Sequence, residues 1–156
     1  MHIRLLAVGE RQPGWVDAGF REYVERFPRQ WKFRLDIIAS AHRGRGASAD
    51  EAMAVESDKI LAKLTPAEYV VVLDERGRQF SSLELAEKID KWQSIGHDLA
   101  FVIGGPDGLS ERCLRRGNLR WSLSGLTLPH GLARVLFAEQ MYRAWSVNAG
   151  HPYHRE

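Results

Sequence analysis

One hydrophobic run that stops at a glycine turn constrains the fold of this chain more than any other feature. Residues 99–103 are all apolar, and Gly104-Gly105-Pro106-Asp107-Gly108 follows directly. A short, continuously apolar run bounded by turn residues indicates a strand buried on both faces, as in a parallel sheet. Residues 69–74 have the same character. Parallel strands need crossover helices that cover both faces of the sheet, so an α/β fold is expected.

The rest of the chain alternates between strand and helix patterns. Further strands are predicted at 3–8, 33–38 and 119–123. Helices are predicted from soon after the turn 11–14 to Phe27, at about 48–64 and 81–92, after Ser110, and at about 130–147. Ser81 and Glu84 form a capping box that marks a helix start, and residues 75–78 read as the turn that ends strand 69–74. We therefore predict a mainly parallel sheet with helices on both faces, built by residues 1–156 as a single domain.

Composition excludes several kinds of site. The single cysteine, Cys113, rules out an internal disulfide and any metal site with several cysteines, and we expect it to be an ordinary, partly buried thiol. His151 and His154 have the spacing of half a metal site, but no carboxylate or cysteine set completes it, so no metal is expected.

Charge and hydropathy set the expected compartment and partners. No apolar run approaches the roughly 20 residues that span a bilayer, and the N-terminus lacks a signal-peptide pattern. A cytoplasmic protein with no membrane partner is expected. The net charge of +2 permits a nucleic-acid partner without indicating one.

The glycine turn at 104–108 and a loop of small residues at 123–130 are candidate ligand-binding segments. Ligands of open α/β sheets bind at the carboxyl ends of the strands, and glycine lets the backbone approach a ligand closely. Neither segment matches a P-loop or a dinucleotide fingerprint. The glycine turn by itself is equally compatible with a plain strand-to-helix connection.

Four motifs occurring in order are more specific. They are Gly104-Gly105-Pro106-Asp107-Gly108, Leu126-Thr127-Leu128-Pro129-His130, Glu139-Gln140-Met141-Tyr142-Arg143-Ala144 and Pro152-Tyr153-His154-Arg155-Glu156. Over essentially its whole length the chain resembles the SPOUT-class methyltransferases that act on a pseudouridine of large-subunit ribosomal RNA. The resemblance implies a deep C-terminal trefoil knot, which the rarity of knots would otherwise argue against. It also implies an obligate homodimer that methylates 23S rRNA within the ribosome, each active site being completed by the partner's C-terminal tail.

The resemblance further implies that S-adenosylmethionine (S-adenosyl-L-methionine) is the cofactor. The residues expected to bind it are Leu73, Gly104, Gly105, Leu123, Ser124, Gly125, Leu126, Thr127 and Leu128. Leucine side chains and neighbouring backbone groups suit adenine, and the glycines leave room for the ribose and the methionine tail.

The implied reaction is displacement of the sulfonium methyl group by N3 of a pseudouridine, which carries a proton in the neutral base. His154 is the side chain best suited to take up that proton near neutral pH. Arg143 could hold phosphate or stabilise charge on the base oxygens, and Tyr153 could stack on the base or bind it by a hydrogen bond. Glu139 falls on the apolar stripe of its helix, where a buried carboxylate needs a partner or an edge position.

From the residues alone, two other kinds of protein remain possible for this chain. A non-catalytic ribosome-binding factor would use Arg43, Arg45 and Arg115 to bind RNA without affinity for S-adenosylmethionine. A flavodoxin-like nucleotide or flavin module fits the sheet pattern but leaves the terminal Pro-Tyr-His unexplained.

Overall fold

The computed structural model describes residues 1–44, 46 and 48–155, and its strands form one parallel sheet in the order β2-β1-β4-β3-β5. The strands are β1 (Ile3–Val8), β2 (Arg34–Ile38), β3 (Tyr69–Gln79), β4 (Leu99–Ile103) and β5 (Leu119–Ser122). Every neighbouring pair is parallel, which confirms the predicted sheet. The strand order is compatible with the C-terminal knot, whose threading stays a prediction.

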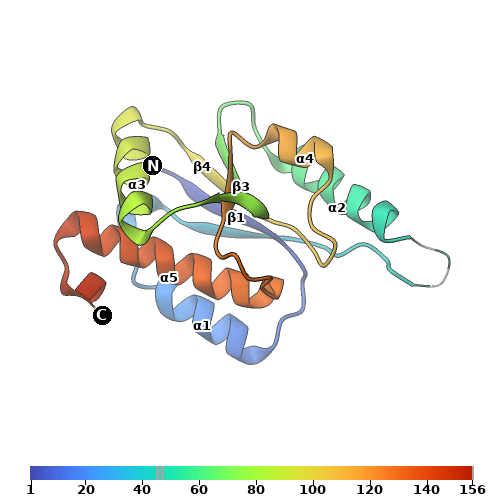
Figure 1. Cartoon of the computed structure of the whole chain (residues 1–156), viewed down its shortest axis with the longest axis horizontal. Coiled ribbons are helices and arrows are strands. Elements are labelled where there is room, and N and C mark those ends of the chain that lie inside the picture. Colours follow the sequence, from blue (N-terminus) through green and yellow to red (C-terminus); the bar gives the residue numbers. More distant parts are fainter. Residues whose placement is uncertain (45, 47, 156) are drawn as a thin grey trace.

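Helices cover both faces of the sheet, as predicted (Figure 1). They are α1 (Gly14–Val24), α2 (Ala49–Lys63), α3 (Ser82–Ile95), α4 (Glu111–Arg116) and α5 (His130–Ala149), with short 3-10 turns η1 (Arg29–Trp31) and η2 (Pro152–Arg155). Helix α5 packs against α1 and α3 on one face, while α2 and α4 pack together on the other. The sheet is therefore the middle layer of three.

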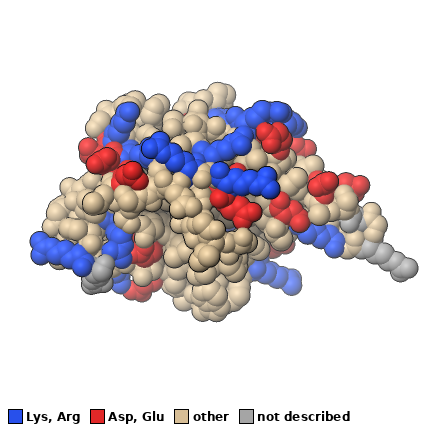
Figure 2. Space-filling model, viewed as in Figure 1, with Lys and Arg blue, Asp and Glu red and all other residues tan. Residues whose placement is uncertain are grey.

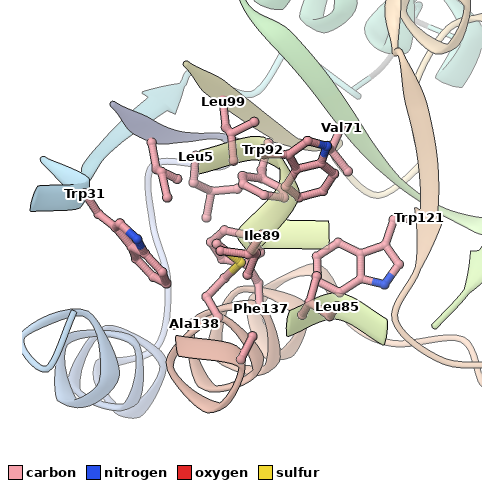
Figure 3. Close-up of a cluster of buried hydrophobic side chains, with 14 of the residues drawn as sticks. Leu5, Trp31, Val71, Leu85, Ile89, Trp92, Leu99, Trp121, Phe137 and Ala138 are labelled. Carbon is pink, nitrogen blue, oxygen red and sulfur yellow. The ribbon is translucent and has the colours of Figure 1, made fainter. Parts of the chain in front are cut away.

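The larger core lies between the sheet and the layer of α1, α3 and α5 (Figure 3). Alternate residues of β4 divide between the two cores: Phe101 faces this layer, whereas Val102 faces α2 and α4. The ring of Phe101 lies 4.9 Å from that of Phe137 on α5, centroid to centroid. Burial of one such side chain contributes about 1.5–3 kcal/mol. These contacts hold α5 across the sheet and so fix where its two ends lie.

The capping box predicted at the start of α3 is present. The Ser81 hydroxyl accepts a hydrogen bond from the Glu84 N–H at 3.1 Å, and the Glu84 carboxylate accepts one from the Ser81 N–H at 2.7 Å. Both bonds satisfy backbone donors that the helix itself cannot pair. At the other end of the chain, Gly150 ends α5 in the left-handed conformation (φ 69°), which glycine adopts without steric cost.

The turn predicted at residues 75–78 is wrong, because these residues belong to β3. Leu73 and Arg78 both pair with Trp121 of β5, so residues 74–77 bulge out of the ladder before pairing resumes. Gly77 allows β3 to pair with β5 again after the bulge. Any larger residue would clash, because a Cβ there would lie 2.7 Å from the carbonyl carbon of Arg120. The strand continues because β5 supplies a partner beyond the bulge, and the residues of β3 alone do not reveal that partner.

Candidate active site

A cleft of about 490 Å³ lies at the carboxyl ends of β3, β4 and β5. This volume is within the usual range of about 300–1,000 Å³ for small-molecule sites. Eight of the nine predicted cofactor residues line it, namely Leu73, Gly104, Gly105, Leu123, Ser124, Leu126, Thr127 and Leu128. Gly125 lies in the same loop but is not a lining residue. The structure thus brings three segments that are far apart in the sequence to one place.

Several lining residues were missed by the sequence analysis. Arg76, Arg120 and His130 belong to this group. Arg76 was assigned to a turn, and Arg120 to a strand without a known neighbour. His130 had a possible signal in its motif, but its position directly before a helix gave no reason to place it in the cleft.

The loop from Ser124 to Leu128, most of which lines the cleft, has backbone groups without a hydrogen-bond partner among the described residues. Ser124 accepts two hydrogen bonds. Its carbonyl accepts one from the Ser122 hydroxyl at 2.8 Å, and its hydroxyl accepts one from the Leu126 N–H at 2.9 Å. The Thr127 hydroxyl donates to Glu75 at 3.1 Å. Within the described part of the chain, the other backbone groups of residues 124–128 have no hydrogen-bond partner. Backbone polar groups need partners, so these can bind a ligand.

The apolar wall of the cleft includes a strongly exposed side chain. Leu126 is 74% exposed, the largest exposure among the big hydrophobic residues of the described chain. Leu123 and Leu128, on either side of it in the loop, are half-buried. A flat apolar ligand group placed among these three side chains would remove apolar surface from water.

The glycines of the turn after β4 are needed by the protein's own packing. A Cβ on Gly104 would lie 2.8 Å from the carbonyl oxygen of Gly108, and one on Gly105 would lie 2.8 Å from Oε1 of Glu56. The Gly108 N–H donates to the Gly105 carbonyl at 3.0 Å and closes the turn. The sequence predicted that these glycines let a ligand come close. In the structure they first of all let other parts of the chain come close.

Behind this turn lies a buried ion network. Glu56 is 1% exposed and receives two hydrogen bonds from Arg43, at 2.5 and 2.6 Å. Arg43 also donates through Nε to Asp107 of the turn at 2.7 Å. The hydrogen bonds that Arg43 donates to Glu56, and then the one it donates to Asp107, raise the pKa of Arg43. Arg43, considered above as an RNA-binding residue, is thus committed to two carboxylates, and Arg45 lies outside the described residues.

The first turn of α5 closes the cleft on the side of β1. Arg134 is 3% exposed and donates to the carbonyl oxygens of Val8 and Gly9, at 3.0 and 2.7 Å. Its buried Nε has no hydrogen-bond partner in the described chain. One turn earlier, His130 lines the cleft. Burial, followed by the nearby charge of Arg134, lowers the pKa of His130 below its ordinary value, so the ring is neutral at pH 7.

The three predicted catalytic residues gather at the other end of α5, where Glu139 organises two of them. Oε1 of Glu139 accepts hydrogen bonds from Arg143 Nε at 2.9 Å and from the Tyr153 hydroxyl at 3.0 Å. The Arg143 guanidinium also lies 5.0 Å from the centre of the Tyr153 ring. His154 lies beside this pair in η2, with Nδ1 2.5 Å from the His151 carbonyl oxygen. Gln140 donates to the other carboxylate oxygen, Oε2, at 2.6 Å, so Glu139 has three partners where the sequence indicated only that it needs one.

Burial raises the pKa of Tyr153, and hydrogen bonds to Tyr23 and Glu139 add to the effect. The phenol therefore keeps its proton at pH 7 and acts as a donor. Tyr142 packs against it with ring centroids 4.7 Å apart, so the tail is held by aromatic contact as well as by charge.

Comparison with known proteins decides the family. The family described as "Predicted SPOUT methyltransferase" matches residues 1–154. This chain belongs to the SPOUT methyltransferase family. Proteins named ribosomal RNA large subunit methyltransferase H are 46% identical to it in Hahella chejuensis and 47% identical in Thioalkalivibrio sulfidiphilus, each over 100% of both chains. The protein of that name in Chromohalobacter salexigens is 48% identical over 99% of this chain and all of its own.

Solved structures support the fold of this SPOUT methyltransferase. A probable methyltransferase from Bordetella pertussis superposes with a TM-score of 0.56 at 17% identity, covering 91% of this chain and 95% of its own. A probable methylase family protein from Haemophilus influenzae gives a TM-score of 0.57 at 14% identity, covering 97% of this chain and 69% of its own. At such identities the likeness concerns the fold alone.

The cleft and the C-terminal cluster of the SPOUT methyltransferase do not meet within one chain. His130 begins α5 at the cleft, and Arg143 lies thirteen positions later on the same helix. An α-helix rises about 1.5 Å per residue, so the two lie about 20 Å apart along its axis. Figure 1 shows the C-terminus at the far end of α5 from its first turn.

In residues 1–44, 46 and 48–155, no group of three or more His, Cys, Asp or Glu residues could hold a metal ion, and no helix is long and apolar enough to cross a membrane. Cys113 is fully buried, and burial raises its thiol pKa to about 11. A thiol that is both inaccessible and protonated is a packing residue, which agrees with the prediction of an ordinary thiol, although Cys113 is fully and not partly buried.

Proposed function

We propose that this SPOUT methyltransferase transfers a methyl group from S-adenosylmethionine to N3 of a pseudouridine in 23S rRNA, within the assembled ribosome and as a homodimer. The observation that carries the proposal is the convergence of eight predicted cofactor residues on one cleft, in a chain whose full-length relatives are named large-subunit RNA methyltransferases. The specific base, the ribosomal substrate and the dimer rest on the family resemblance.

The residues of the cleft fit the proposed cofactor. Unpaired backbone groups of loop 124–128 can bind the polar edge of adenine, and Leu123, Leu126 and Leu128 offer apolar contacts to its faces. Leu73 adds to this wall from the end of the regular part of β3. When bound, S-adenosylmethionine supplies an electrophilic methyl group.

The C-terminal cluster has the chemistry that the acceptor base needs. We assign His154 as the acceptor of the N3 proton, since imidazole exchanges protons near neutral pH. Arg143, oriented by Glu139, would stabilise negative charge that develops on the base oxygens. Tyr153 keeps its proton and would hold the base by stacking or hydrogen bonding. Each of these groups holds or moves a proton or a charge near N3.

The distance between these parts supports the proposed homodimer. Proton transfer requires contact at hydrogen-bond distance, whereas Arg143 lies about 20 Å along α5 from His130 of the same chain's cleft. A partner's tail placed over the cleft would complete the site. Light scattering at micromolar concentration should give a dimer, and an active monomer would contradict the proposal.

Labelled methyl transfer tests the function directly. The purified protein is incubated with S-adenosylmethionine that carries a labelled methyl group and with one of three substrates: ribosomes that lack this methylation, free large-subunit RNA, or small-subunit RNA. Label is located by nuclease digestion and mass spectrometry. The proposal expects label on a pseudouridine of 23S rRNA within ribosomes. RNA binding without cofactor binding would instead indicate a non-catalytic factor.

A further inference from the structure

The bulge in β3 places arginines at the rim of the cleft. Residues 74–77 leave the ladder between the two residues that pair with Trp121, and Gly77 then packs against the backbone of Arg120. Arg76 and Arg78 flank Gly77 in the sequence, so three arginines meet where β3 and β5 rejoin. Arg76 and Arg120 line the cleft, whereas Arg78 lies outside it.

A lysine from another element extends this group. The Arg78 guanidinium lies 5.4 Å from the centre of the Phe80 ring, and Nζ of Lys88 on α3 lies 4.6 Å from the same centre. One aromatic ring therefore holds two cationic groups beside the cleft. We refer to Arg76, Arg78, Lys88 and Arg120 as the basic rim. Figure 2, viewed as in Figure 1, shows a band of Lys and Arg side chains across the face of the molecule turned to the reader.

Within the described residues, most of this charge has no close ion-pair partner, although Asp74, Glu75 and Glu111 also line the cleft. Among the ion pairs of the described residues, none includes Arg76, Arg78 or Lys88. Arg120 makes only a long contact, 3.7 Å, with the exposed Glu111. This differs from Arg43, whose charge is matched by two carboxylates. β-bulges next to active sites commonly re-aim side chains, and this one brings Arg76 to the cleft, where no close ion pair fixes its guanidinium among the described residues.

We propose that the basic rim binds the sugar–phosphate backbone of the RNA that carries the target base. The inference rests on the proposed function, since it assumes an RNA substrate at this cleft. Arginine matches phosphate in geometry and charge, and lysine adds a further point charge. The rim joins the cleft through Arg76 and Arg120, so a strand held on it has its bases beside the cofactor site. Phosphate contacts fix register and orientation but carry no sequence preference.

The test uses Arg78 and Lys88, because neither lines the cofactor cleft. The double variant Arg78→Gln/Lys88→Gln removes two positive charges from the rim. The matched control, Lys32→Gln/Lys63→Gln, removes two from exposed positions at the amino ends of the strands, the opposite edge of the sheet. Methylation of undermethylated ribosomes gives kcat and KM, calorimetry gives the Kd of S-adenosylmethionine, and KM is followed over about 50–200 mM salt.

In the rim variant, KM for ribosomes should rise roughly tenfold at physiological salt, and the slope of log KM against log salt should fall by about two. kcat and the Kd of the cofactor should stay within about twofold of the wild type, because the cleft is untouched. The control should behave like the wild type. An unchanged KM in the rim variant, or an equal rise in the control, would overturn the inference. If the wild-type protein methylates no ribosomal RNA, the proposed function fails instead, and the two failures are thereby distinguished.

Discussion

Glu139 and Tyr153 are joined by a hydrogen bond of 3.0 Å, although one lies within α5 and the other in the C-terminal tail. The same carboxylate oxygen receives the Arg143 guanidinium. The tail is therefore organised on α5 before any second chain or RNA is present. Preorganised groups lose less freedom when the substrate binds, so the Glu139 carboxylate has a positioning role for the residues proposed to act on the base.

Substitution of Glu139→Ala should release both side chains. Loss of the carboxylate removes the hydrogen bonds that it accepts from Arg143 and Tyr153 and should lower the free energy of unfolding by about 1–3 kcal/mol. Turnover should fall at least about tenfold, with cofactor affinity close to normal. Urea unfolding, kcat and calorimetry measure the three quantities. Glu87→Gln, an exposed carboxylate on α3, is the control, and a Glu139→Ala enzyme with wild-type kcat would remove the positioning role.

His154→Ala and Arg143→Ala should each reduce turnover by at least about tenfold, with cofactor affinity near normal. His154 would no longer accept the N3 proton, and Arg143 would no longer stabilise charge on the base. Arg143→Lys separates charge from geometry, since lysine keeps the charge but lacks the planar fork. Steady-state kinetics with ribosomes decides each case, and unchanged turnover would exclude that residue from the mechanism.

Mixed dimers should show whether the active site is shared between chains. Leu126→Asp places a carboxylate on the exposed apolar wall of the cleft, and His154→Ala removes the proposed proton acceptor. Each homodimer should be nearly inactive. After exchange at equal amounts, half of the dimers are mixed and each has one intact shared site, so about a quarter of wild-type activity should return. No recovery, with exchange verified by mass spectrometry, would mean that each site is built from one chain.

The positions of most elements could be predicted because their signals are local. The apolar run of β4 shows burial on both faces, and the Ser81–Glu84 capping box marks the start of α3 to the residue. Cofactor residues could be grouped because carboxyl ends of parallel strands share one edge of the sheet. These inferences need only neighbouring residues and one topological rule.

What could not be predicted depends on partners that are distant in the sequence. Residues 74–77 leave β3 and the strand resumes only because β5 lies beside it. Arg43 turns inward because Glu56, on α2, and Asp107, after β4, meet at one point. A flexible cationic side chain in a polar loop has the same sequence pattern whether it faces solvent or a buried carboxylate.

Stability should depend on pH through His130. Burial lowers its pKa in the folded state, so the unfolded chain binds the proton more readily. The resulting stabilisation is complete above the ordinary pKa of about 6.5 and is lost as the pH falls from there through the folded-state value. Urea unfolding between about pH 8 and 5 should show a smaller loss for His130→Asn than for the wild type. The other histidines are common to both proteins, and equal losses would contradict the assignment.

Gly77→Ala should disrupt the junction of β3 and β5. A Cβ at this position would lie 2.7–2.8 Å from three backbone atoms of Arg120 and Trp121, and backbone cannot move aside as a flexible side chain can. We expect a loss of about 1–3 kcal/mol in the free energy of unfolding, together with weaker cofactor binding, because β5 leads directly into loop 124–128. Gly14→Ala is the matched control, since a Cβ there meets nothing within 4 Å. If Gly77→Ala is as stable as the control, the two strands can separate at this point without cost. The close packing of β3 on β5 after the bulge would then not fix the rim of the cleft.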